Sequence, residues 1–236
     1  MNKFGIIGKP LEHSYSAQYF NQKFAYEKID ADYQLYEIDD LTDIHALIQQ
    51  LHGFNVTYPY KQMIMEHLQS IDPIAKEIGA VNVVCQGKGY NTDWIGFMRS
   101  IIPHLTPHDR HALVLGTGGV SKAVQYALHK MGITYTLVSR QRCNNTIAYE
   151  ELTEAIMQSN TIIINCTPLG MLPDVDSLPA IPYQYLNPTH LLYDCVYNPA
   201  CTAFLHQGAI RGARILNGLQ MLYQQADAAW EIWQKQ

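Results

Sequence analysis

Short apolar runs separated by amphipathic segments are the feature that most constrains what this chain can fold into. The runs at 111–116 (HALVLG) and 161–166 (TIIINC) are short and do not alternate as a strand with one wet face does. Such continuous runs are typical of strands covered on both faces, as in parallel sheets. Between two other runs, the segment 41–51 has apolar residues at helical spacing. The alternation predicts an α/β fold with helices on both faces of mostly parallel sheets.

The predicted elements fall into two series. The first has strands at 3–8, 33–38, 53–57 and 81–85, a short strand near Tyr90, and helices at 17–28, 41–51 and 61–68. The second has strands at 111–116, 133–139, 161–166 and 190–196, a helix that ends at Met131 and a helix at 149–158. A polar, proline-containing stretch at 103–110 separates the series, and an amphipathic helix at 218–234 can return to the first. We therefore expect two α/β units with a boundary near 93–110.

Composition and charge exclude several classes of protein. Of the 236 residues, 47% are hydrophobic and 16% charged, which is too apolar for an intrinsically disordered chain. The formal net charge is −5 and no basic run occurs, so nucleic acid is not an expected partner. No run reaches the length of a membrane span, and the apolar stretch between Lys3 and Lys9 is too short for a signal-peptide core.

The cysteines and histidines favour a cytoplasmic protein without a metal site. The five cysteines are odd in number and contain no C-x-x-C pair, which is typical of reduced thiols in the cytosol. His104, His108 and His111 superficially resemble a ligand set. They lie beside Pro103 and Pro107 and ahead of a predicted strand, so we interpret them as part of an exposed connector.

A glycine-rich turn follows the predicted strand at 111–116. Gly116 permits a tight turn, and Gly118 lets the backbone approach a pyrophosphate. A helix that begins near Gly119 points its free N–H groups at the anion. Ser121 occupies the third position of the G-x-G-x-x-G pattern, and glycine turns of this kind also occur without a nucleotide.

The end of the next predicted strand indicates which dinucleotide is preferred. An NAD site places an acidic residue there, whereas this chain has Ser139, Arg140, Gln141 and Arg142, and its next acid is Glu150. A guanidinium group suits a ribose 2′-phosphate, which a carboxylate would repel. The pattern favours NADP over NAD, and the alternative is an ordinary solvated cation at a strand end.

A lysine and an aspartate at element ends are candidates for acid–base chemistry. Lys61 lies at a predicted helix start, where its charge opposes the helix macrodipole, and desolvation would lower its pKa toward a useful range. Asp93 also lies at a predicted helix start. A surface lysine and an N-capping aspartate are the alternatives, and Ser14 and Ser16 can likewise be helix caps. Capping does not explain why these segments follow strands, where open α/β sheets bind ligands.

Eight blocks, in order from the first strand to the last helix, resemble those of the shikimate/quinate dehydrogenase family. They are GKPLEHSYS (8–16), GFNVTYPYK (53–61), GAVN (79–82), YNTDWIG (90–96), GTGGVSKAV (116–124), NCTPLGM (165–171), DCVYNP (194–199) with Thr202, and GLQMLYQQA (218–226). The chain resembles a short member of that family, because its connections between residues 140 and 165 are shorter than those of typical members. We expect a compact cofactor domain with weakened adenosine contacts.

The resemblance implies a particular division of the chain. Residues 1–92 and 218–236 would form a substrate-binding and catalytic domain with a mixed, mostly parallel sheet. Residues 93–217 would form a Rossmann-like NADP-binding domain. Both are expected to be three-layer α/β domains, with a cleft between them.

The resemblance also implies residue roles, with Lys61 and Asp93 as the acid–base pair. The substrate carboxylate would be bound by Ser14, Ser16, Thr57 and Tyr197, and the ring hydroxyls by Lys61, Asn82, Asp93 and Gln225. The NADP pyrophosphate would be bound by Gly116, Gly118, Gly119 and Val120, and the adenosine 2′-phosphate by Ser139, Arg140 and Arg142. The rest of the cofactor channel would be lined by Thr167, Pro168, Leu169, Val196, Gly218 and Met221.

The activity implied is the reversible NADPH-dependent reduction of 3-dehydroshikimate to shikimate in aromatic amino acid biosynthesis. Protonated Lys61 would supply the proton at the ketone oxygen while Asp93 holds the ammonium in place. A quinate or aminoshikimate dehydrogenase is the alternative within the same class. An NADP-binding module without turnover is an alternative from a different class, against which Lys61 and Asp93 argue. We expect a monomer or homodimer that binds a small-molecule substrate and no metal.

Overall fold

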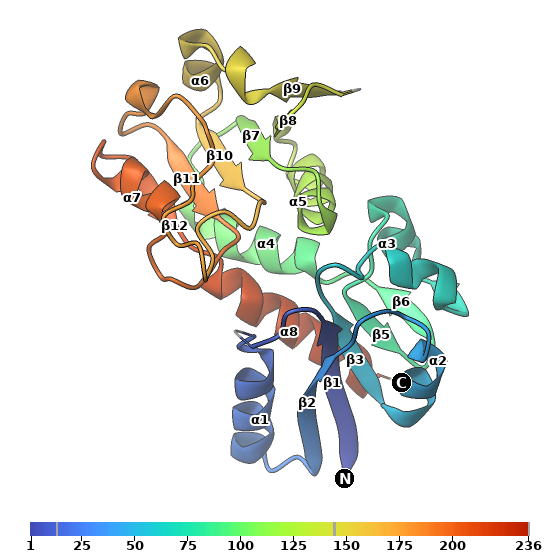
Figure 1. Ribbon diagram of the computed structural model, residues 1–236. Coiled ribbons are helices and arrows are strands. Elements are labelled where there is room, and N and C mark those ends of the chain that lie inside the picture. The colour runs from blue at the N-terminus through green and yellow to red at the C-terminus, as the bar shows by residue number, and fades with distance from the viewer. Residues whose placement is uncertain (13, 144, 236) are drawn as a thin grey trace. The chain divides into compact units, whose positions relative to one another are not determined.

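The computed structural model describes residues 1–12, 14–143 and 145–235 (Figure 1). Residues 1–96 and 222–236 form one compact unit, unit 1, and residues 97–221 form a second, unit 2. The chain passes between them within two helices, α4 (Asp93–Ile101) and α8 (Leu219–Gln234). Each unit contains a six-stranded sheet covered by helices, which confirms the α/β class predicted from the alternating apolar runs.

The sheet of unit 1 is mixed and has the strand order β2-β1-β3-β5-β6-β4. Its strands are β1 (Asn2–Gly8), β2 (Ala31–Glu37), β3 (Gly53–Val56), β4 (Ser70–Ile71), β5 (Val83–Cys85) and β6 (Lys88–Tyr90). β1 is parallel to β2 and β3, and β4 is parallel to β6, whereas β5 is antiparallel to both its neighbours. A two-residue turn at Gln86 and Gly87, both with positive φ, joins β5 to β6 and requires an antiparallel pair.

Both faces of this sheet are buried. The helices of unit 1 are α1 (Ser16–Glu27), α2 (Ile44–Gln50), the 3-10 helix η1 (Met63–His67), α3 (Pro73–Ile78) and most of α8. Phe4 and Ile6 of β1 pack with α1 and α8, whereas Ile7 points to the other face and packs with Ile44 of α2 and Ala75 of α3. Successive residues of a strand point to opposite faces, so a continuous apolar run is what a sheet covered twice requires.

The last helix is fixed to the sheet by one tryptophan. The Trp233 ring stacks on Phe4 with 4.9 Å between ring centroids, and its indole Nε1 donates a hydrogen bond to the Val84 carbonyl at 3.1 Å. Gly53 leaves the space for this ring, because a Cβ there would lie 2.3 Å from the indole. The C-terminal segment therefore belongs to the core of unit 1.

The sheet of unit 2 is parallel throughout, with the order β12-β11-β10-β7-β8-β9. Its strands are β7 (His111–Leu115), β8 (Thr134–Ser139), β9 (Thr146–Ala148), β10 (Ile162–Asn165), β11 (Leu191–Asp194) and β12 (Arg214–Leu216). Counted from β7, this is the doubly wound order 3-2-1-4-5-6 in reverse. The strand order changes direction between β7 and β10, and ligands of such sheets bind at the carboxyl ends of the strands on either side of that point.

Helices cover both faces of this sheet as well. Besides part of α4, the helices of unit 2 are η2 (Ile102–His104), α5 (Gly119–Lys130), η3 (Tyr149–Glu151), α6 (Glu154–Ser159), η4 (Tyr183–Tyr185) and α7 (Ala203–Ala209). Met157 of α6 and Phe204 of α7 pack with Leu113 and Leu192 on one face. On α4, Phe97 makes an edge contact with the Tyr193 ring at 4.9 Å.

Two of the predicted helices are wrong. The segment at 61–68 is a turn followed by the five-residue 3-10 helix η1, so Lys61 precedes a helix start rather than occupying one. The segment at 149–158 is broken into η3 and α6, because Leu152 and Thr153 are extended and the Thr153 hydroxyl caps α6 through the Ile156 N–H. The prediction also missed the short elements β4, α3, β9, α7 and β12.

Candidate functional site

A buried lysine–carboxylate pair lies at the edge of unit 1 where β3 and β6 are continued by loops. The Lys61 Nζ donates to Asp93 Oδ2 at 2.7 Å, and the two side chains are 14% and 7% exposed. Of the three N–H donors of this ammonium, the described residues engage one. The remaining donors can therefore reach an oxygen atom of a bound molecule while the carboxylate holds the ammonium in place.

Asn82 is the centre of the polar cluster behind this pair. Its Nδ2 donates to Asp93 Oδ1 at 2.9 Å and lies 3.0 Å from Thr92 Oγ1 and 3.2 Å from Gln225 Oε1. Its Oδ1 accepts the Thr92 backbone N–H at 2.7 Å. All four residues are less than 10% exposed. The structure thus brings together four predicted site residues, Lys61, Asn82, Asp93 and Gln225, from three separate parts of the chain.

Local backbone contacts hold both members of the pair. Before Lys61, the buried Tyr60 donates through its hydroxyl to the Ile38 carbonyl at 2.7 Å, and the Val81 N–H donates to the Lys61 carbonyl at 2.7 Å. Asp93 opens α4, but the Asn91 Oδ1 accepts its backbone N–H at 3.0 Å. The capping function is thus supplied by Asn91, and the carboxylate of Asp93 remains available to Lys61.

Thr57 directly follows β3, Ser14 lies in the segment between β1 and α1, and Ser16 is the first residue of α1. A Cβ on Gly8 would lie 2.3 Å from the Thr57 side chain, so the two loops are in close contact there. Ser14 Oγ accepts the Ser16 N–H at 3.4 Å, and Ser16 is buried against the Tyr33 hydroxyl. His13, in the same block, lies outside the described residues.

A hydrogen-bonded chain connects this serine segment to Asn82. The Tyr33 hydroxyl donates to Asn55 Oδ1 at 2.7 Å, and Asn55 Nδ2 donates to the Asn82 carbonyl at 3.2 Å. Burial raises the pKa of Tyr33 well above its ordinary value, so the phenol stays neutral and can act as the donor. Tyr197, the remaining residue predicted at the substrate carboxylate, is partly buried in unit 2.

The glycine turn of unit 2 is built as the sequence predicts. Gly116 has a φ of +99°, and Gly118 immediately precedes α5. Among the described residues, none outside its immediate chain neighbours and its own helix has an atom within 4 Å of a Cβ placed on Gly118, so the backbone faces open space there. The first N–H groups of α5, including those of Gly119 and Val120, precede any helical acceptor. This arrangement fits a dinucleotide pyrophosphate.

Ser121 explains how the third glycine of the pattern can be replaced. The residue is fully buried, and its hydroxyl donates to the Gly116 carbonyl at 2.7 Å. Gln125 donates to the same hydroxyl at 3.1 Å. The serine therefore ties the start of α5 to the turn, so close packing of helix and strand does not require glycine here.

Asp194 organises the loops that follow β10 and β11. It accepts hydrogen bonds from Asn165 Nδ2 at 2.9 Å, the Val196 N–H at 2.9 Å and Thr202 Oγ1 at 2.6 Å. Asn165 in turn accepts from the Thr167 N–H and hydroxyl at 3.0 and 2.6 Å. Burial raises the pKa of Asp194 to about 6, although these hydrogen bonds oppose the shift.

The other residues predicted at the cofactor surround these loops. Thr167 lies against the turn, because a Cβ on Gly116 would be 2.9 Å from its methyl group. Leu169 donates its N–H to Thr167 Oγ1 at 3.3 Å, and Pro168 between them is exposed. The Gly218 N–H donates to the Val196 carbonyl at 3.1 Å, which joins the start of α8 to the same edge. Met221 is buried one turn further along that helix.

The residues predicted at the 2′-phosphate follow β8. Arg140 is exposed and has no carboxylate within ion-pair distance in the described part of the chain. Arg142 pairs with Glu151 at 2.7 Å, and Glu151 also accepts the Ala148 N–H at 2.7 Å. The Ser139 hydroxyl donates to the Gln141 carbonyl. Of these two arginines, Arg140 is therefore the one whose charge is not neutralised by a carboxylate of the described residues.

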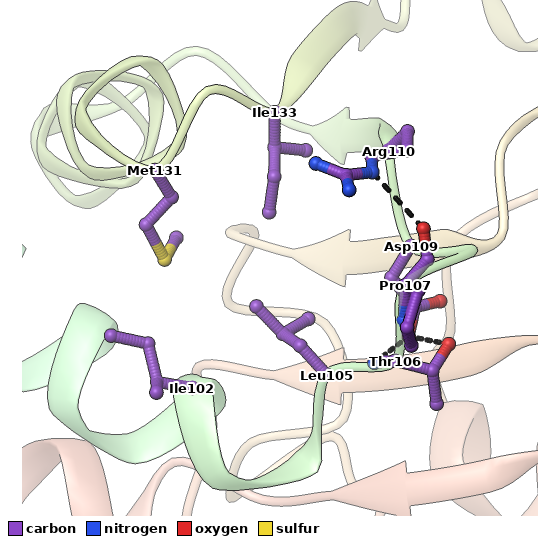
Figure 2. A pocket seen from close by; sticks show the side chains of 8 residues that line it. All are labelled: Ile102, Leu105, Thr106, Pro107, Asp109, Arg110, Met131 and Ile133. Atoms are coloured by element: carbon purple, nitrogen blue, oxygen red, sulfur yellow. Dashed lines mark hydrogen bonds between the residues drawn. The ribbon is translucent and has the colours of Figure 1, made fainter.

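A separate pocket lies at the opposite end of the unit 2 strands (Figure 2). Arg110 and Ile133, which line it, precede β7 and β8, whereas the glycine turn follows β7. Its carboxylate, Asp109, is bound by Arg214 at 3.1 Å and by Thr106. Burial favours a raised pKa of Asp109, but these hydrogen bonds outweigh it and lower the pKa. The charged groups of the pocket are thus engaged in structural contacts.

The described residues contain neither a candidate metal site nor a candidate membrane span. No group of three or more His, Cys, Asp or Glu side chains there is arranged to hold a metal ion. Nor does that part of the chain contain a helix with the length and apolar character needed to cross a bilayer.

The sequence did not reveal the buried residues that hydrogen-bond to the predicted site residues and hold them in place. Thr92 has no predicted role, yet it is fully buried between Asn82 and Gln225. Asn55 and Asn165 also support site residues through their amide groups. Both are amide residues of otherwise apolar strands. Burying an amide costs free energy unless it is hydrogen-bonded, so an amide in such a strand indicates a supporting contact.

Comparisons with known proteins agree with this arrangement. A family model described as the shikimate dehydrogenase substrate binding domain matches residues 6–84. A shikimate dehydrogenase (NADP(+)) of Clostridium beijerinckii is 38% identical over 100% of this chain and 93% of its own length. One of Desulforamulus reducens is 33% identical over 97% of this chain and 88% of its own length.

Solved structures show the same similarity. The crystal structure of shikimate dehydrogenase 1 from Peptoclostridium difficile has a TM-score of 0.88 and 37% identity, covering 100% of this chain and 92% of that one. The shikimate 5-dehydrogenase of Thermus thermophilus, in complex with NADP(H) and shikimate, has a TM-score of 0.89 and 27% identity, covering 100% of this chain and 94% of that one.

Proposed function

Because this chain belongs to the shikimate dehydrogenase family, we propose that it catalyses the reversible NADP-dependent interconversion of 3-dehydroshikimate and shikimate. The observation that carries the proposal for this chain is the buried Lys61–Asp93 pair, which leaves ammonium donors available next to a cluster of amide groups. In this proposal unit 1 binds the substrate and unit 2 binds NADP.

Lys61 acts on the reacting oxygen. In the reduction direction its ammonium donates a proton to the ketone oxygen, and in the oxidation direction its neutral amine takes that proton from the hydroxyl. Asp93 accepts from the ammonium at 2.7 Å and keeps it oriented, while Asn82 fixes the other carboxylate oxygen at 2.9 Å. When bound, NADPH supplies the hydride that reduces the carbonyl carbon.

The neighbouring polar groups bind the rest of the substrate. We assign the ring hydroxyls to Asn82 and Gln225, and the substrate carboxylate to the hydroxyl donors of Ser14, Ser16 and Thr57. A site that hydrogen-bonds several hydroxyls rejects analogues that lack one, because its own buried polar groups would then be unpaired.

The residues of unit 2 fit NADP. Gly116, Gly118, Gly119 and Val120 would hold the pyrophosphate at the start of α5, where the open space at Gly118 admits it. Arg140 would hold the 2′-phosphate, with Ser139 and Arg142 adjacent. Thr167, Pro168, Leu169, Val196, Gly218 and Met221 would line the remainder.

The test of the catalytic assignment is the oxidation of NADPH in the presence of 3-dehydroshikimate. We expect Lys61→Ala to lower kcat at least about a hundredfold, which corresponds to about 2.7 kcal/mol of transition-state stabilisation. Lys76→Ala, an exposed lysine of the same unit, is the matched control and should leave kcat unchanged. Normal turnover by folded Lys61→Ala would disprove the assignment, with thermal unfolding used to check that the variant is folded.

A second variant tests the cofactor preference. We expect Arg140→Ala to raise the KM for NADPH about tenfold and to leave the KM for NADH nearly unchanged, because only NADPH carries the 2′-phosphate. Arg142→Ala is the comparison, with a smaller effect since Glu151 already neutralises that guanidinium. Equal effects of Arg140→Ala on both cofactors would contradict the role given to Arg140.

A further inference from the structure

Two cysteine thiols lie next to each other at the carboxyl edge of the unit 2 sheet. Cys166 follows β10 and Cys195 follows β11, and the residues before them, Asn165 and Asp194, are register partners. The Cys195 N–H donates to the Asn165 carbonyl at 2.9 Å, which continues the ladder into this pair. The two Sγ atoms are 3.8 Å apart, and both side chains are partly exposed.

Each of these cysteines contacts a segment that we assign to NADP. A Cβ on Gly116 would lie 3.5 Å from the carbonyl group of Cys166, and Thr167 is the next residue in the chain. A Cβ on Gly218 would lie 2.3 Å from the Cys195 carbonyl oxygen. A change in the backbone at either cysteine is therefore transmitted to the cofactor loops without an intervening side chain.

We propose that Cys166 and Cys195 form a dithiol that a hydroperoxide converts to a disulfide, and that the disulfide weakens NADP binding. The second part rests on the proposed function, whereas the first does not. One thiolate attacks the peroxide oxygen, the O–O bond breaks, and a sulfenic acid and water or an alcohol are formed. The second thiol attacks the sulfenic sulfur, and water leaves. Two thiols are oxidised by two electrons, and the peroxide takes up those electrons and the two thiol protons.

The geometry explains why the disulfide would weaken NADP binding rather than strengthen it. A disulfide holds its sulfur atoms about 2.05 Å apart, so the two Sγ atoms must approach by about 2 Å. The cysteines are on adjacent parallel strands whose preceding residues are fixed in register, so side-chain rotation and a small movement of the following loops must supply that approach. The loop after Cys166 contains Thr167, and the loop that begins with Cys195 lies against Gly218. The bridge therefore strains the cofactor site rather than the sheet.

The experiment uses the full-length reduced protein. It is treated with hydrogen peroxide, the remaining thiols are alkylated, and the peptides are identified by mass spectrometry, while calorimetry measures the Kd for NADP before and after. We expect a linked peptide pair containing Cys166 and Cys195, a Kd raised about tenfold and recovery on treatment with dithiothreitol. Cys195→Ala should form no link and keep its Kd through peroxide treatment. The matched control Cys201→Ala, at an exposed cysteine, should behave as the unmodified chain does.

The outcomes separate the two parts of the proposal. The proposal would be overturned if Cys166 and Cys195 were both still alkylated in a sample whose exposed Cys143 and Cys201 had been oxidised. A linked pair with an unchanged Kd would overturn the effect on NADP. If the reduced protein binds NADP but does not reduce 3-dehydroshikimate, the proposed function fails, and a linked pair with a raised Kd still supports the dithiol site.

Discussion

At the residue scale, two buried carboxylates, one in each unit, depend on buried amide side chains. Asn82 donates to Asp93 at 2.9 Å, and Asn165 donates to Asp194 at 2.9 Å. Asn82 also lies 3.2 Å from Gln225 Oε1 on α8, and Asn165 also accepts the Thr167 N–H in the loop after β10, so each amide connects its carboxylate to another segment. The chemistry of Asp93 and Asp194 therefore differs through their other partners, a lysine ammonium in one case and neutral groups in the other.

Asp194 should make the stability of the protein depend on pH. Its pKa of about 6 lies above the ordinary value of 3.8, so between these values the folded chain keeps a proton that the unfolded chain has lost. The free energy of unfolding should accordingly fall as the pH rises from 4 to 6, by about 2 kcal/mol from this group. Asp194→Asn, which cannot ionise, should show a flatter dependence in urea unfolding across this window. An identical slope in both proteins would contradict the assignment.

The sequence was sufficient to predict which residues would meet at the Lys61 site but not how they are supported. Four residues that the family resemblance implies do cluster there: Lys61 and Asp93 follow β3 and β6, Asn82 precedes β5, and Gln225 lies on α8. Whether Asp93 is a cap or a partner of Lys61 could not be decided from spacing, since both roles need a carboxylate at a helix start. The deciding contact is Asn91 to the Asp93 N–H, which depends on the loop conformation.

At the element scale, the turn between β7 and α5 contains a position, Gly118, where a substitution should weaken ligand binding without lowering stability. Gly118 has a φ of −74°, which alanine adopts without strain, and no protein atom lies within 4 Å of the added Cβ. Gly118→Ala should therefore leave thermal stability nearly unchanged and raise the Kd for NADP at least about tenfold, because the methyl group occupies space at the start of α5. Calorimetry with NADP and a thermal melt measure the two effects. A lost fold, or an unchanged Kd, would show that the turn has a different role.

The errors in predicting elements also have a common cause. Central strands of the parallel sheet are predictable because burial on both faces makes them continuous apolar runs, as at β10. The segment at 61–68 contains enough apolar residues for a helix, but of these only Ile64 is buried. The break before α6 depends on a threonine cap, and β12 is a short strand with one exposed apolar residue. Elements this short contain too few residues for a helical or strand period of apolar residues to be recognised in the sequence.

At the scale of the whole molecule, one C-terminal side chain completes unit 1. Trp233 stacks on Phe4, occupies the space above Gly53 and donates to the Val84 carbonyl at 3.1 Å. Trp233→Ala should lower the free energy of unfolding of unit 1 by about 3–5 kcal/mol, because it leaves a cavity and an unpaired carbonyl. Hydrogen exchange measured by mass spectrometry should show protection lost in residues 1–96 and retained in 98–220. Uniform loss throughout would mean that the units unfold together.

The position of α8 in the chain has a consequence for synthesis. Unit 2 is made from one continuous stretch, whereas unit 1 needs the residues after Leu222 to cover Phe4 and Phe24. During synthesis, β7 to β12 are all translated before that helix. The face of the unit 1 sheet that carries Phe4, where Phe24 of α1 also packs, is consequently covered by α8 only after every strand of unit 2 has been translated.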